Sequence, residues 1–117
     1  MSGHGALADT AWRPVEIAGE PVPDDTSLMI RFAIDGGLSG HGGCNTFTGR
    51  YTIDRVTLTF GPLASTRKAC PPAIMRRETG FAAALAATRL FMRDGTRLTL
   101  KDARGISHLR LVQIVAV

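Results

Sequence analysis

A glycine-rich stretch from Asp35 to Tyr51 constrains this chain more than any other feature. Six of its seventeen residues are glycine. Glycine destabilises strands and helices, so it is favoured only where the backbone needs a positive φ angle or where another backbone segment approaches closely. The stretch therefore predicts a loop shaped by its backbone. It contains Cys44, and the second of the two cysteines, Cys70, stands just before Pro71 and Pro72. We expect the loop to be held against the segment around Cys70.

A chain of 117 residues predicts one domain with a single core. Its composition, 44% hydrophobic and 21% charged, is typical of a soluble globular protein. No apolar run approaches the roughly 18 residues that a membrane helix needs, so we expect no membrane span. The first residues lack the features of a signal peptide. Localisation therefore stays open between the cell interior and an exported form whose signal has been removed.

The net charge of +4 raises the question of an anionic partner. Twelve of the fourteen basic residues are arginine, and they are spread along the chain. Only residues 67–68 and 76–77 form basic pairs, and no run interleaves aromatic with basic residues as single-strand binders do. We therefore expect solvated strand faces and no nucleic-acid partner.

The pattern predicts a loose N-terminal arm over residues 1–10 and a single domain over residues 11–117. Alternating apolar and β-branched residues between turn signals predict short strands. Pro14 favours an edge position for the first strand because proline has no amide hydrogen to donate. Asp35-Gly36, Asp54 and Asp94-Gly95 indicate hairpin turns. The predicted strands are Trp12 to Ile17, Leu28 to Ile34, Leu38 to Gly40, Thr46 to Ile53, Arg55 to Phe60, Arg89 to Met92, Arg97 to Lys101 and Ile106 to Val117.

One helix is predicted after Pro71 and Pro72, where proline loses nothing because first-turn amides have no partner inside a helix. Ile74, Phe81 and Leu85 fall on one face, and alanines fill positions 82–84, 86 and 87. The predicted fold class is α+β: a small antiparallel, barrel-like sheet of about seven or eight strands with one α-helix.

One ordered set of residues runs through most of the chain: Trp12, Gly43-Cys44-Asn45, Phe47, Gly49, Tyr51, the string from Leu58 to Thr66, Ala69-Cys70, Met75, Glu78, Phe81 and Leu85. Taken together, these residues resemble the META domain, also called HslJ-like. The resemblance covers Trp12 to about Leu111. It implies a compact β-rich domain with one helix, common in bacterial envelope proteins and heat-shock-associated lipoproteins, with no established catalytic residues.

The resemblance also implies that Cys44 and Cys70 pair as a disulfide. Two cysteines without a visible signal would otherwise indicate two buried thiols, because reducing compartments keep thiols apart. Their placement, one in a glycine loop and one at a helix start, favours a crosslink between elements that share few hydrogen bonds.

Two chemical alternatives involve Cys44. His41 and Asn45 stand near it in sequence, a set reminiscent of thiol hydrolases, but nothing in the spacing holds the histidine as a base. His41, Cys44, Cys70 and His108 could supply four zinc ligands, but no close pair of cysteines exists. We expect loop polarity in the first case and no metal or other cofactor in the second.

Glu78 projects from the apolar face of the predicted helix, where carboxylates rarely lie without a partner. It should accept hydrogen bonds from the segment of residues 63–70 or pair with Arg67, and it should be largely buried. Together with Asn45 and Thr66, it is a candidate for structural support of the loop or for a polar pocket.

These features favour a non-enzymatic module, envelope- or stress-associated, whose partner is an unknown envelope protein or a small ligand. A barrel that binds a small molecule in its mouth is the alternative from a different class. A thiol-dependent enzyme centred on Cys44 is a further alternative, and it requires an exposed thiol of low pKa.

Overall fold

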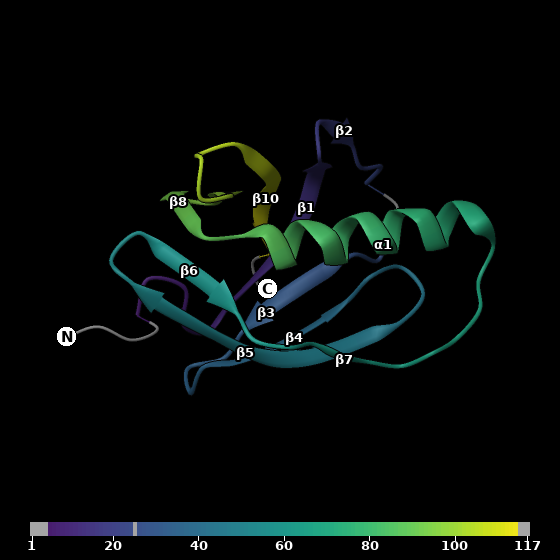
Figure 1. The fold of residues 1–117 in the computed structure, drawn as a ribbon, viewed down its shortest axis with the longest axis horizontal. Coiled ribbons are helices and arrows are strands. Elements are labelled where there is room, and N and C mark those ends of the chain that lie inside the picture. The colour runs from purple at the N-terminus through teal and green to yellow at the C-terminus, as the bar shows by residue number, and fades with distance from the viewer. Residues whose placement is uncertain (1–4, 25, 115–117) are drawn as a thin grey trace.

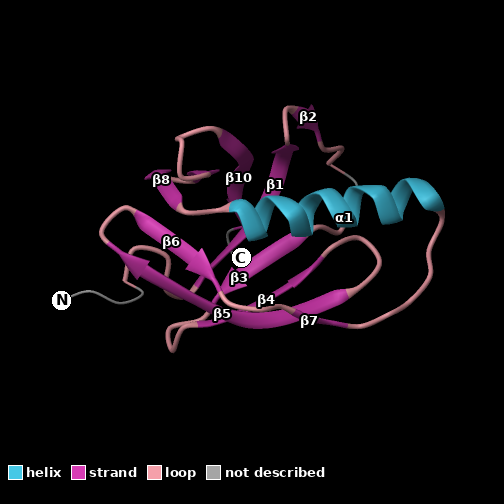
Figure 2. Ribbon diagram, viewed as in Figure 1, coloured by secondary structure: helices cyan, strands magenta, loops and turns pink. Residues whose placement is uncertain are grey.

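Ten strands and one helix make up the part of the chain, residues 5–24 and 26–114, that the computed structural model describes. Figure 2 shows the strands surrounding a common interior, with the helix lying across them. The elements are β1 (Thr10–Ile17), β2 (Glu20–Pro21), β3 (Met29–Phe32), β4 (Gly37–His41), β5 (Thr46–Asp54), β6 (Thr57–Phe60), β7 (Ala64–Ser65), α1 (Pro72–Ala87), β8 (Leu90–Asp94), β9 (Arg97–Lys101) and β10 (Ser107–Ile114).

Eight of these strands close into an antiparallel barrel. Their order around the ring is β1, β3, β4, β5, β6, β8, β9 and β10, and β10 pairs with β1 to close it. Two short strands extend the ring, β2 on β1 and β7 on β5. The predicted fold class, a barrel-like antiparallel sheet with one helix, is confirmed.

Within the ring, the neighbouring strands β6 and β8 share the fewest paired positions. These strands pair at a single position, Thr57 opposite Leu90. Two backbone hydrogen bonds of 2.9 Å, from Leu58 N–H to the Arg89 carbonyl and from Phe91 N–H to the Val56 carbonyl, complete the contact. Beyond this point β6 diverges from β8, and α1 lies alongside (Figure 1).

Large apolar side chains fill the barrel interior. Trp12, Phe32, Tyr51 and Phe81 are essentially inaccessible to solvent. The Phe32 and Tyr51 rings meet edge to face with centroids 4.8 Å apart, a favoured aromatic geometry. From α1 the core receives Phe81, Ala84 and Leu85, whereas Ile74 is only half-buried. The interior is thus a packed core, as expected for a small closed barrel.

The predicted edge position of Pro14 is wrong, because β1 is paired on both sides. β10 runs along one side of β1, and β3 followed by β2 run along the other. Pairing with β3 ends at Trp12 and pairing with β2 begins at Glu16, while the β10 register shifts between Pro14 and Glu16. Pro14 therefore sits at an irregularity, where a missing amide hydrogen is tolerated.

The predicted N-terminal arm is too long. Leu7 is fully buried in the core, and Arg93 donates a hydrogen bond of 2.7 Å to the Ala6 carbonyl. The same guanidinium lies 5.1 Å from the centroid of the Trp12 ring. Residues 5–10 therefore pack against the domain, and residues 1–4 lie outside the described part.

The remaining differences concern short strands and turns. β2 and β7 were not predicted, because two paired residues leave no periodic pattern. The hairpin predicted around Asp54 turns over residues 54–57, with Arg55 at a φ angle of 59°, so β6 begins two residues later than predicted. The predicted last strand ends at Ile114 in the described region, and residues 115–117 lie outside it.

Candidate functional site

The glycine loop and the start of α1 meet at one end of the barrel. Residues 42–45 connect β4 to β5 and pass close to the first turns of α1. We call this contact, formed by residues 42–45, Thr66, Lys68, Cys70 and Glu78, the loop–helix junction. No side chain caps the start of α1. Because proline has no N–H group, the prolines there reduce the number of first-turn amides that need a hydrogen-bond acceptor.

Cys44 and Cys70 form a disulfide, with their Cα atoms 6.1 Å apart, so the predicted pairing is confirmed. Cys44 is buried and Cys70 is half-buried. The bond joins residues 26 positions apart in the chain. It connects the glycine loop to the residue that precedes the helix prolines.

The Glu78 carboxylate receives three hydrogen bonds from the glycine loop. One oxygen accepts the backbone N–H groups of Cys44 at 3.0 Å and Asn45 at 2.6 Å. The other accepts the Asn45 side-chain amide at 2.7 Å. The Glu78 carboxylate therefore links the loop to α1. Successive amide groups of the loop bind it as they would bind a free anion.

The expected partners of Glu78 were wrong in part. We predicted donors from residues 63–70 or an ion pair with Arg67, but Cys44 and Asn45 of the loop donate to the carboxylate. Glu78 is also half-buried, whereas we expected it to be largely buried. The apolar-face position of Glu78 indicated that it needed a partner, but it carried no information about which segment supplies the donors.

Asn45 connects the loop to the segment that leads to Cys70. Its side chain is 4% exposed, and its carbonyl oxygen accepts the Lys68 N–H at 2.7 Å and the Thr66 hydroxyl at 2.9 Å. Its amide group also donates to the Lys68 carbonyl at 3.3 Å. Thr66 in turn accepts the Thr46 N–H at 3.1 Å. The three residues proposed as structural or pocket residues, Asn45, Thr66 and Glu78, thus form one hydrogen-bonded chain.

Gly42 is required by the position of Glu78. A Cβ atom added at Gly42 would lie 2.6 Å from Glu78 Cγ and 2.8 Å from its carboxylate oxygen. The next residue, Gly43, has a φ angle of 104°, which favours glycine. These two glycines allow the loop amides to approach the carboxylate, a role that the sequence indicated only as a general need for backbone freedom.

Two opposing effects act on the ionisation of Glu78. Partial burial acts to raise the pKa of its carboxyl group, whereas the hydrogen bonds from Asn45 and Cys44 lower it, with a further contribution from His41. The net effect holds the pKa of Glu78 below its ordinary value of 4.5. Glu78 is therefore ionised in the folded protein at neutral pH.

Glu78→Gln is expected to destabilise the protein at pH 7, with a smaller effect as the pH falls below about 4.5. Because the folded pKa lies below the unfolded one, the charged form stabilises the fold above the unfolded pKa, and this contribution is lost as pH falls through the folded pKa. Urea unfolding at pH 7, 5, 4 and 3 measures the difference between variant and parent. Glu20→Gln, at an exposed position, controls for losing one charge. An equal difference at pH 7 and pH 3 would contradict the prediction.

The Nδ1 atom of His41 is engaged within the loop and with Ser27. This atom accepts the Gly43 N–H at 3.1 Å and lies 3.2 Å from the Ser27 hydroxyl. The sulfur of Cys44 is bonded to Cys70. The arrangement with Asn45 that resembled a thiol hydrolase in sequence thus forms a turn in the structure.

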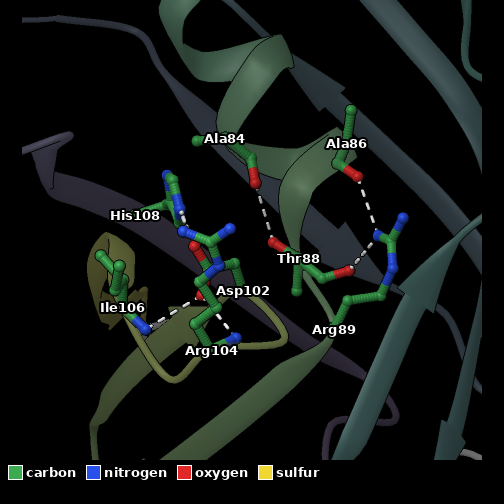
Figure 3. A network of polar contacts seen from close by, with 8 residues as sticks. All are labelled: Ala84, Ala86, Thr88, Arg89, Asp102, Arg104, Ile106 and His108. Atoms are coloured by element: carbon green, nitrogen blue, oxygen red, sulfur yellow. Dashed lines mark hydrogen bonds and ion pairs between the residues drawn. The ribbon is translucent and has the colours of Figure 1, made fainter.

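His108 lies in a different contact from the cysteines. Its Nε2 atom lies 2.8 Å from Asp102, whose other oxygen accepts the N–H groups of Arg104 and Ile106 (Figure 3). The hydrogen bond from His108 is the largest cause holding the pKa of Asp102 below its ordinary value. Over the described residues, no three His, Cys, Asp or Glu side chains gather where they could hold a metal ion.

The fold and junction define a class: a small antiparallel barrel with one helix across it, in which a disulfide and a carboxylate hold the glycine loop to the helix start. Residues 5–113 match the META domain family. The chain belongs to the META domain family, which confirms the resemblance seen in the sequence. No curated protein matches the chain.

Solved structures share this fold at low sequence identity. A solution structure of a protein from Burkholderia xenovorans is 24% identical, with a TM-score of 0.77, and the match covers 96% of this chain and 86% of that one. A crystal structure of a DUF4847 family protein from Bacteroides vulgatus is 18% identical, with a TM-score of 0.71, covering 93% and 95% of the two chains. At these identities the likeness concerns the fold alone.

No helix in the described ranges is both long enough and apolar enough to cross a bilayer.

Proposed function

We propose that this META domain is a non-catalytic module of the bacterial envelope or of a stress response, and that it works by binding a partner or stabilising an assembly. The observation that carries the proposal is the Cys44–Cys70 disulfide. It occupies the only two thiols of the chain. A disulfide between structural elements also persists best in an oxidising compartment such as the bacterial periplasm.

The contacts of the junction favour a structural role for its polar groups. The Glu78 carboxylate accepts two backbone N–H groups of the loop and the side-chain amide of Asn45, and that amide also donates to the Lys68 carbonyl. Groups committed in this way are poorly placed to transfer a proton to or from a substrate. The packed interior likewise favours binding at the surface over a small molecule inside the barrel.

Turnover assays test the non-catalytic part of the proposal. Oxidised and reduced protein should give background rates on ester, thioester and peptide libraries, and Cys44→Ala and Cys70→Ala should behave alike. Turnover that disappears in Cys44→Ala but survives in Cys70→Ala would establish the thiol enzyme and overturn the proposal.

The thiol state in cells tests the compartment. Cells that express the native gene are quenched with acid and treated with a maleimide polymer before and after reduction. We expect no mass shift before reduction and two additions after it. Two reactive thiols before reduction would contradict an envelope location, because they would place the chain in a reducing compartment.

A further inference from the structure

The strands β6 and β7 form an open sheet edge that faces α1. Both strands pair with the same strand, β5, one after the other along its length (Figure 1). On their other side, β6 pairs with β8 only at Thr57, and β7 pairs with no further strand in the described chain. An unpaired edge of this kind presents backbone N–H and C=O groups.

The ladder register shows which groups these are. The Gly61 N–H bonds to the Arg50 carbonyl and the Thr66 N–H bonds to the Thr46 carbonyl, so these residues face β5. Because N–H and C=O directions alternate along a strand, the backbone groups of Phe60 and Ser65 point away from β5, toward the α1 side. They are available to a further extended segment.

Two open hollows lie between this edge and α1. The first lies between residues 59–63 and the helix residues Ala82 and Ala86. The second lies between residues 63–69 and Met75. Leu63 lines both, so we treat them as one surface and call it the helix–edge groove. Met75, Ala82 and Ala86 fall within about 40° of one another on a helical wheel, so the wall is one flank of α1.

The dimensions and lining of the groove fit a short extended peptide. Met75 and Ala86 are about 16 Å apart along α1 at about 1.5 Å per residue. An extended chain covers that length with about five residues at roughly 3.3 Å each. Ala82 and Ala86 are exposed and small, which leaves room for apolar side chains of modest size.

The charges at the groove are of one sign. Arg89 lines the hollow at the C-terminal end of α1, and Arg67 and Lys68 line the other hollow. Among the residues that the structure describes, no acidic one lines either hollow. Figure 3 shows Arg89 folded over the helix end, where one of its nitrogens donates to the Ala86 and Thr88 carbonyls. Its guanidinium group is thus held at the groove end.

We infer that the helix–edge groove binds an extended peptide segment of a partner protein, about five residues long, with small apolar residues in its middle and acidic residues at its ends. The segment pairs with the backbone of Phe60 and Ser65 as an added strand and places its apolar side chains against Ala82, Ala86 and Leu63. Its carboxylates face Arg89 at one end and Arg67 with Lys68 at the other. This inference rests on the proposal that the domain works by binding.

The probe is a set of synthetic pentapeptides, acetylated and amidated, with Asp or Glu at both ends and Ala, Val or Thr in the middle. Titration into isotopically labelled, oxidised protein is followed by amide chemical shifts. We expect saturable shifts confined to residues 59–69 and 75–89. Lysine-ended peptides and peptides N-methylated at the central amide should bind at least about tenfold more weakly, because they lose the charge match or the strand pairing.

A matched pair of variants separates groove blocking from general damage. Ala82→Leu fills the groove wall, whereas Ala83→Leu adds the same atoms to an exposed helix position that lines neither hollow. Both retain helix propensity. Ala82→Leu should weaken peptide binding at least about tenfold, and Ala83→Leu should leave it within about twofold.

Three results would overturn the inference: no peptide binding below a Kd of about 1 mM, shifts centred outside the groove, or equal effects of the two leucine variants. Binding that is insensitive to N-methylation would indicate a site for small apolar molecules instead. Concentration-dependent shifts without peptide would indicate a second copy of the chain. If the peptides do not bind, the proposal that the protein is non-catalytic is still tested separately by the turnover assays. Turnover that depends on Cys44 would contradict the non-catalytic proposal but would not change peptide binding.

Discussion

Reducing the Cys44–Cys70 disulfide is expected to lower the free energy of unfolding by about 2 to 4 kcal/mol. The bond closes a loop of 26 positions, for which the chain-entropy estimate is about 3.5 kcal/mol. That is a large part of the stability of a small domain. The effect should be local first, because without the covalent bond the loop is held to the helix mainly by the hydrogen bonds of Glu78 and Asn45. Hydrogen exchange should quicken over residues 36–49 before it quickens in the β8–β9 hairpin.

Urea unfolding with and without reductant measures this loss. The Cys44→Ser, Cys70→Ser double variant is the control, since reductant should not change its stability. Equal unfolding midpoints for oxidised and reduced parent protein would contradict the prediction, and so would exchange that quickens first in the β8–β9 hairpin.

Gly42→Ala is expected to cost about 2 to 4 kcal/mol, a large effect for one added methyl group. The new Cβ atom would overlap Glu78, whose carboxylate cannot move away without losing its hydrogen bonds to Cys44 and Asn45. Hydrogen bonds to a charged group are among the stronger ones in proteins. The cost therefore arises from the broken contact between loop and helix.

A double-mutant cycle isolates that contact. Glu78→Ala alone should cost about 1 to 3 kcal/mol, because it leaves the loop amides without their acceptor. In the Glu78→Ala background, Gly42→Ala should cost less than about 1 kcal/mol, since the overlapping atoms are gone. Gly61→Ala is the control, because its added Cβ would meet its nearest atom at 3.9 Å. Additive costs in the cycle would show that Gly42 is needed for another reason.

The fold could be predicted largely because its signals are local. Asp94-Gly95 marks the β8–β9 hairpin by itself, and the alternation of apolar residues gives most strands directly. The pairing between β6 and β8 could not be predicted, since one paired position leaves no pattern. β7 was missed for a similar reason, although it forms part of the groove edge.

The junction could be predicted only in part, for a physical reason. Cys44, Cys70 and Glu78 were each identified by their local setting, and the family resemblance supplied the pairing of the cysteines. Which amides reach Glu78 depends on how residues 42–45 cross the helix, and that path is a tertiary property. The need for Gly42 follows from the same crossing.

The pairing of β1 with β10 bears on how the protein is made. β10 is synthesised after the other described strands, and it completes the ring by joining β1, from Ala11 opposite Ile114 to Ile17 opposite Leu109. Until then both β1 and β9 expose an edge that can pair with another chain. A nascent chain stalled before residue 107 should therefore depend on a chaperone to avoid aggregation.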